Sequence, residues 1–285
     1  RFDDFDTFWI IDKVPDENEL YKIVEFVCSN GKNIICVEEE YLDQIEKICK
    51  RYNVKLLQCN YETIEIPEKK WNYDSEIIGI DIPVVAVMGI GQNVQKFDLQ
   101  LYLRSRFIDK GYKVSQIGTK KISGLFGLHP LPDFLFNTQY SDVDKVYAFN
   151  RVMKDVSMQE KPDVILLGIP DSLLPLNNKH RFNAVQPDFV ITSLMANNGY
   201  NDEFYSEISK MAKYKYNVNI DAYFVSQFCP LSNSIWSEKL SYVYLPRMEL
   251  PKTEYKVYTT SDLNNDILFK QAEKKLLLYG KYEQY

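Results

Sequence analysis

One stretch constrains the fold more than any other: a buried apolar run leads into a glycine-bearing turn, and a helical pattern follows directly. Residues 82–88, Ile-Pro-Val-Val-Ala-Val-Met, form a nearly continuous apolar run that fits a parallel strand covered on both faces. The turn from Gly89 to Lys96 comes next, and apolar residues then repeat at helical spacing from Leu99 to Phe107. The sequence therefore predicts a strand, a turn and a helix, the connection from which α/β proteins are built.

The turn, Gly89-Ile-Gly-Gln-Asn-Val-Gln-Lys96, is typical of a loop that binds phosphate. Small residues let backbone N–H groups surround phosphate oxygens at a helix N-terminus, while a lysine supplies a point charge to the outer phosphates. We expect Gly89, Gly91 and Asn93 to shape the loop and Lys96 to contact phosphate. ATP or another nucleotide is the ligand that such a loop would hold.

Two residues depart from the standard pattern G-x-x-x-x-G-K-[ST]. Gln95 replaces the glycine before Lys96, and Phe97 stands where a Ser or Thr would hold magnesium. A phenyl ring cannot ligate a hard cation that prefers oxygen donors. The sequence therefore argues against efficient magnesium-dependent phosphoryl transfer, and we expect no metal ligand in the loop.

The loop more closely resembles those of dethiobiotin-synthetase-type proteins, where a first glycine, a short polar stretch, Val, Gly, Lys and Thr follow in order. Gly89, Val94 and Lys96 keep their places in that order.

Residues 166–177, LLGIPDSLLPLN, resemble a strand-end segment of the same fold, in which an acidic residue and glycines precede a Leu-Leu-x-Pro-Leu run. Leu167 occupies the place of that acid. Asp171, four residues further on, is the candidate to replace the missing carboxylate from the turn.

Three interpretations of the loop stay open from the sequence. The first is a plain β-to-α connection in which Lys96 is solvated. The second is binding of a nucleotide or another phosphate ligand without fast hydrolysis. The third is an ATP-dependent ligase or synthetase that activates a carboxylate or an amine, in which Lys96 and Asp171 organise the phosphates and His129 assists. An imidazole changes charge near neutral pH, although a hydrogen bond that anchors the loop is the other interpretation of His129.

The 285 residues suit two domains. Alternating strand and helix patterns predict a small Rossmann-like βαβαβ domain over residues 1–60. Residues 61–80 mix Pro67 with charges and show no sustained period, as a connector does. Residues 81–285 then form a larger, mostly parallel-sheet, P-loop-like α/β domain with a C-terminal helix.

The expected strands lie at 7–12, 33–37, 55–58, 82–88, 112–117, 163–167, 189–194, 222–225, 242–245 and 255–258. The expected helices lie at 17–28, 41–52, 97–111, 142–156, 202–214 and 262–279, and residues 118–134 are expected to form a long loop.

Composition excludes several classes of protein. A formal charge of −6 and a pI near 5.2 argue against a general nucleic-acid binder, which needs clustered Lys and Arg. No apolar run is long enough to span a bilayer, and the first residues are acidic, so we expect a cytoplasmic protein without membrane insertion. Five cysteines without a CxxC pair indicate reduced, buried thiols rather than a zinc site.

Two segments, MGIGQNVQKFDLQ at 88–100 and IGTKKISGLFGLHPLPDF at 117–134, resemble a family of clostridial peptide-maturation proteins found with radical-SAM maturases of ribosomally made peptides. The resemblance covers most of the chain. It implies an accessory role in maturation of such a peptide, with a peptide maturase or a precursor peptide as partner. It transfers no catalytic residue, so a non-catalytic partner-binding module with a vestigial loop stays an alternative.

Overall fold

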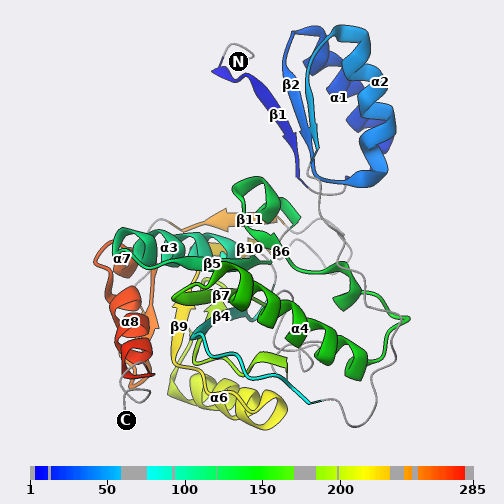
Figure 1. Ribbon diagram of the computed structural model, residues 1–285. Coiled ribbons are helices and arrows are strands. Elements are labelled where there is room, and N and C mark those ends of the chain that lie inside the picture. The colour runs from blue at the N-terminus through cyan, green and yellow to red at the C-terminus, as the bar shows by residue number, and fades with distance from the viewer. Residues whose placement is uncertain are drawn as a thin grey trace. The chain divides into compact units, whose positions relative to one another are not determined.

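A computed structural model describes residues 4–11, 14–58, 76–91, 94–119, 121–169, 184–197, 199–231, 241–245 and 250–279 (Figure 1). The chain divides into two compact units, residues 1–63 with 121–130 and residues 64–120 with 131–285. The boundaries expected from the sequence, 1–60, 61–80 and 81–285, stay a prediction because most of the connector lies outside the described residues.

The smaller unit contains a three-stranded parallel sheet in the order β1-β2-β3, formed by β1 (Thr7–Ile10), β2 (Asn33–Cys36) and β3 (Leu56–Gln58). Its helices are α1 (Glu17–Ser29) and α2 (Leu42–Tyr52), and a short 3-10 helix, η2 (Glu39–Tyr41), precedes α2. The side chain of Asp16 caps the first turn of α1. This arrangement confirms the predicted βαβαβ order.

Three cysteines of the smaller unit, Cys28, Cys36 and Cys49, are buried free thiols. The Sγ atoms of Cys28 and Cys49 lie 3.9 Å apart. Burial raises the pKa of Cys49 to about 12, which keeps this thiol protonated and unreactive.

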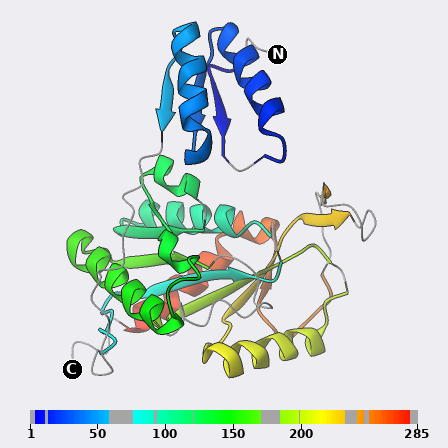
Figure 2. The same cartoon turned by 90° about the vertical axis from the view of Figure 1, so that its right-hand side faces the viewer.

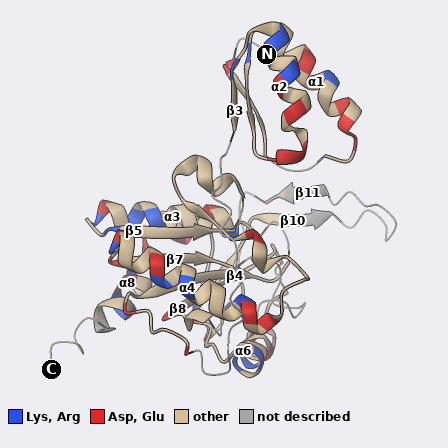
Figure 3. Cartoon of the chain, turned by 45° about the vertical axis from the view of Figure 1, so that its right-hand side comes forward, with Lys and Arg blue, Asp and Glu red and all other residues tan. Residues whose placement is uncertain are grey.

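The sheet of the larger unit has its strands in the order β12-β9-β8-β4-β7-β5. All pairs from β12 to β5 are parallel. The strands are β4 (Val84–Gly89), β5 (Val114–Gly118), β7 (Val164–Gly168), β8 (Phe189–Leu194), β9 (Ala222–Val225) and β12 (Val257–Tyr258). Strand β6 (His129–Pro130) belongs to the smaller unit. Strands β4, β7 and β8 carry no charged residue and are drawn in tan (Figure 3), as central strands covered on both faces require.

Helices cover both faces of this sheet (Figures 1 and 2). On one face α3 (Lys96–Asp109) and α8 (Ile267–Tyr279) pack through residues such as Leu103 and Leu268. On the other face α4 (Asp142–Glu160) and α6 (Asp202–Tyr216) pack through residues such as Phe149 and Tyr205. A mostly parallel sheet that is covered by helices on both faces confirms the predicted α/β fold class.

Three segments differ from expectation. The long loop predicted at 118–134 contains β6 and two 3-10 helices, η3 (Lys121–Phe126) and η4 (Asp133–Leu135). The terminal helix predicted at 262–279 is broken into α7 (Thr260–Leu263) and α8 at Asp266, whose φ is 57°. A left-handed residue cannot continue an α-helix, which explains the break.

The third difference is a strand that the sequence did not indicate. Strand β10 (Phe228–Leu231) pairs with β11 (Ser241–Tyr244) in a separate two-stranded antiparallel sheet. A four-residue strand is defined by its partner more than by its own pattern. Among the described residues, no helix combines the length and the apolar content that a membrane crossing requires.

Candidate functional site

The predicted phosphate loop starts at the centre of the larger sheet. It follows β4, which lies between β7 and β8, and Gly89 is in register with Ser193 of β8. The chain leaves β4 into α3 on one face and leaves β8 toward α6 on the opposite face. Ligands of open α/β sheets bind at such a switch point, outside the carboxyl ends of the strands.

Lys96 lies directly against the end of β4. A Cβ atom on Gly89 would come within 2.9 Å of Lys96 Cδ and 2.8 Å of Val94 Cγ2. The lysine stem therefore folds back over the strand end, and a glycine is required beneath it. Lys96 is also the first residue of α3, and the N-terminus of a helix favours negative charge.

Gly91 has a φ of +101°, a backbone conformation that favours glycine. A Cβ atom there would also lie 3.3 Å from Met195 Sδ. Asn93, the third residue expected to shape the loop, lies outside the described residues.

Gln95 has a left-handed backbone conformation, with φ 57° and ψ 26°, which favours the glycine expected at this position. Its Oε1 accepts a hydrogen bond from Ser226 Oγ at 3.0 Å and another from the backbone N–H of Gln227 at 2.9 Å. Gln227 Oε1 in turn accepts from Tyr244 Oη on β11 at 2.8 Å. The amide of Gln95 therefore ties the loop to the end of β9 and, through Gln227, to the β10–β11 pair.

Strand β8 holds the loop from the other side. The backbone N–H of Ile90 donates to the carbonyl of Ser193 at 2.8 Å. The hydroxyl of Ser193, which is fully buried, donates to the carbonyl of Val94. These bonds between protein groups preorganise the loop before any ligand binds.

The groups that hold magnesium in an active P-loop enzyme have no counterpart among the described residues of this edge. The phenyl ring of Phe97 is 9% exposed and packs inward from the first turn of α3. Leu167, in the place of the acid, is fully buried in β7. Asp171 lies outside the described residues. Within the described part of the chain, no three His, Cys, Asp or Glu side chains gather as metal ligands would.

His129 lies in β6, within the residues 121–130 that belong to the smaller unit. Its catalytic role stays a prediction, as does that of Asp171.

No protein-family model and no curated protein matches the chain. Among solved structures it is similar to a DUF1611 family protein from Anabaena variabilis, with 11% identity, a TM-score of 0.50 and coverage of 78% of this chain and 68% of that one. This likeness concerns the fold alone.

Two looser likenesses have TM-scores below 0.5. One is to the signal recognition particle receptor FtsY from Elizabethkingia anophelis in complex with GDP, with 17% identity, a TM-score of 0.33 and coverage of 75% and 71% of the two chains. The other is to a GTPase from Pyrococcus abyssi in its apo form, with 13% identity, a TM-score of 0.32 and coverage of 52% and 68%.

Sequence reasoning missed the residues of the larger unit that hold the loop. Ser193, Ser226 and Gln227 come from the ends of β8 and β9 and bond to loop residues. The available signal was a Ser or Gln at the end of a buried apolar run. In a parallel sheet these ends meet at one edge, which is where ligand contacts gather.

Proposed function

We propose that the P-loop-like unit binds the phosphate group of a nucleotide, or of another phosphate ligand, at the loop from Gly89 to Lys96. One observation carries the proposal: the stem of Lys96 folds over Gly89 at the end of the central strand, where α3 begins. The helix N-terminus presents the positive end of the helix dipole to this point. An anion is the ligand that such an arrangement favours.

The proposed function is binding without fast phosphoryl transfer. Catalysis of that transfer depends on a metal ion that bridges the outer phosphates. Phe97 offers no oxygen to such an ion, and Leu167 offers none from β7. The proposed site therefore keeps the glycines and the lysine that would bind phosphate, and it has no oxygen ligand for magnesium at Phe97 or Leu167.

The test is calorimetric titration of the full chain with ATP, ADP and GDP, with and without magnesium. We expect the Lys96→Ala variant to bind at least tenfold more weakly, because a hydrogen bond to a charged group contributes about 1.5–3 kcal/mol. Magnesium should leave the affinity nearly unchanged.

Lys110→Ala is the matched control, since Lys110 is exposed and follows the last residue of the same helix. It lies about 20 Å from Lys96 at 1.5 Å per residue, and its replacement should not change the affinity. Flat titrations of the wild-type chain with all three nucleotides would contradict the proposal.

Magnesium-dependent turnover that disappears in Lys96→Ala would instead support the alternative, an ATP-dependent ligase-like enzyme that activates a carboxylate or an amine. That enzyme needs a carboxylate near the phosphates, and Asp171 is its candidate. Turnover retained in Asp171→Asn would remove this candidate.

We further propose that the ligand-bound protein is an accessory factor in maturation of a ribosomally made peptide. The resemblance of residues 88–100 and 117–134 to the peptide-maturation family supports this part. Deleting the protein from a producing cell should stop formation of the mature peptide, measured by mass spectrometry. A Lys96→Ala chain that still restores the peptide would favour the non-catalytic partner-binding module, and unchanged peptide after deletion would contradict the accessory role.

A further inference from the structure

Two glutamines are buried beneath α3, in a layer that is otherwise apolar. Gln100 comes one helical turn after Lys96 and is fully buried, and Gln116 of β5 is 1% exposed. The side chains packed between α3 and the sheet include Val87, Leu103 and Leu166. Burying an amide in such a layer is unfavourable unless all of its hydrogen-bonding atoms find partners.

The hydrogen bonds of this glutamine pair are incomplete. Gln116 Nε2 donates to Gln100 Oε1 at 3.3 Å. Gln100 Nε2 and Gln116 Oε1 are both buried without a partner. Exchanging nitrogen and oxygen in both amides would reverse the bond and again leave one donor and one acceptor unpartnered. One donor and one acceptor of the pair therefore have no partner. A single hydroxyl group could bond to both, because a hydroxyl accepts one hydrogen bond and donates another.

The amide of Gln100 reaches the carboxyl edge of the sheet. A Cβ atom on Gly168, the last residue of β7, would lie 2.2 Å from Gln100 Nε2 and 2.6 Å from Thr119 Cγ2. Strand β7 is the neighbour of β4, so the glutamine pair adjoins the edge from which the phosphate loop starts.

Lys96 and Gln100 are also on the same side of α3, because residues four apart in a helix are neighbours. Along the helix axis they are about 6 Å apart. One ligand with two polar groups at about that separation would meet both residues.

We infer that Gln100 and Gln116 recognise a hydroxyl group of the phosphate ligand, which would then be a hydroxyl-bearing phosphate such as a nucleoside phosphate with its ribose. The hydroxyl accepts from Gln100 Nε2 and donates to Gln116 Oε1. This inference rests on the proposed function of the loop. A ligand without the hydroxyl leaves both amide atoms unpartnered, so the site discriminates against it.

The experiment compares ADP with its 2′,3′-dideoxy analogue by calorimetric titration of the full chain. We expect the wild-type chain to bind the dideoxy analogue at least tenfold more weakly than ADP. The double variant Gln100→Leu/Gln116→Leu should bind both compounds alike, with the affinity that the wild type has for the analogue. Replacing both partners of a buried polar pair by apolar groups is nearly neutral for folding, which a thermal unfolding midpoint checks.

If the double variant fails to fold, Gln116→Met keeps the side-chain volume and removes the acceptor, and it should lose most of the discrimination. Equal affinity of the wild type for both compounds, with weaker binding of both by Lys96→Ala, overturns the inference and leaves the phosphate site. Discrimination that survives in the folded double variant also overturns it. A wild-type chain that binds neither compound overturns the inference and the proposed function together.

Discussion

At the scale of single residues, Gln95 shows how a side chain can replace a glycine and gain a second role. The left-handed backbone costs a non-glycine residue roughly 1–2 kcal/mol. The amide oxygen offsets this cost with bonds from Ser226 and Gln227, each worth about 1 kcal/mol. Compared with a glycine, Gln95 makes the backbone conformation less favourable, but its hydrogen bonds hold the loop in a fixed position against β9.

Gln95→Gly should therefore change the free energy of unfolding by no more than about 1 kcal/mol, since it relieves the left-handed backbone and removes two hydrogen bonds. Gln95→Ala removes the bonds and keeps the backbone cost, so it should destabilise the chain by about 2 kcal/mol. Urea unfolding measures both. In both variants, amide hydrogen exchange should become faster at Gln227, and unchanged exchange there would show that the tether does not hold β9.

Gly89→Ala should impair both folding and ligand binding. Its Cβ atom would meet Val94 Cγ2 at 2.8 Å, Lys96 Cδ at 2.9 Å and the Ser193 carbonyl oxygen at 3.1 Å. Overpacking of this kind typically costs about 1–3 kcal/mol and would displace the lysine stem. Gly79→Ala is the control, because nothing lies within 4 Å of its Cβ position. Equal nucleotide affinity in Gly89→Ala and Gly79→Ala would contradict the close approach of Lys96.

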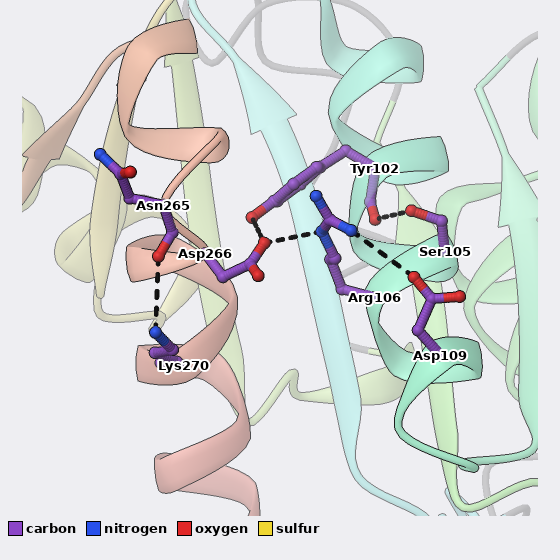
Figure 4. A network of polar contacts seen from close by, with 7 residues as sticks. All are labelled: Tyr102, Ser105, Arg106, Asp109, Asn265, Asp266 and Lys270. Carbon is purple, nitrogen blue, oxygen red and sulfur yellow. Dashed lines mark hydrogen bonds and ion pairs between the residues drawn. The ribbon is translucent and has the colours of Figure 1, made fainter.

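At the scale of elements, Asp266, the residue at which α7 and α8 are separated, connects the C-terminal helix to α3 (Figure 4). The carboxylate of Asp266 accepts a hydrogen bond from Tyr102 Oη at 3.2 Å and pairs with Arg106 Nε at 2.6 Å. The left-handed φ of Asp266 turns its side chain toward α3 at this point. Helix α3 begins at Lys96, the last residue of the proposed phosphate-binding loop, so this contact anchors the helix that follows the loop.

Asp266→Ala should destabilise the chain by about 2 kcal/mol, of which the partly exposed ion pair contributes at most about 1 kcal/mol and the left-handed backbone the rest. Asp266→Asn keeps a hydrogen-bond acceptor and tolerates the left-handed backbone, so its cost should be below about 1 kcal/mol. Urea unfolding at low and high salt measures these values. Equal losses in the two variants would contradict the role of the backbone conformation.

At the scale of the whole molecule, tyrosines with a raised pKa make the free energy of unfolding depend on pH in the alkaline range. Burial raises the pKa of Tyr102, Tyr205 and Tyr223 to about 12. In the unfolded chain these hydroxyls ionise near pH 10. Their contribution is therefore fully present below about pH 10 and is lost as the pH rises from there through about 12, since the unfolded chain then binds fewer protons.

The free energy of unfolding should thus fall steadily above about pH 10, and urea unfolding at several pH values measures the slope. Tyr205→Phe should make this slope shallower, because it removes one of the hydroxyls whose pKa is raised by burial. Tyr214→Phe is the control, since Tyr214 is 87% exposed. A slope that is the same in the wild type and Tyr205→Phe would contradict the assignment.

Much of the fold was predictable because its signals are local. The buried run before Gly89 predicted the central strand, and the predicted bounds of β8 and β9, 189–194 and 222–225, are those of the structure. The side chain of Asn201, directly before the predicted helix, caps α6. Capping and hydrophobic period act over a few residues, so a sequence shows them directly.

The sequence by itself determined the strand, the glycines and the lysine of the loop from Gly89 to Lys96, because these depend on neighbours in the chain. The tertiary structure decided what holds that loop. The Ser193 hydroxyl bonds to a carbonyl 99 positions away, and the Ser226 hydroxyl bonds to an amide 131 positions away. The meeting of Gln100, Gln116 and Gly168 also depends on the order of the strands. Strand order follows from packing of the whole sheet, so no local pattern brings these residues together.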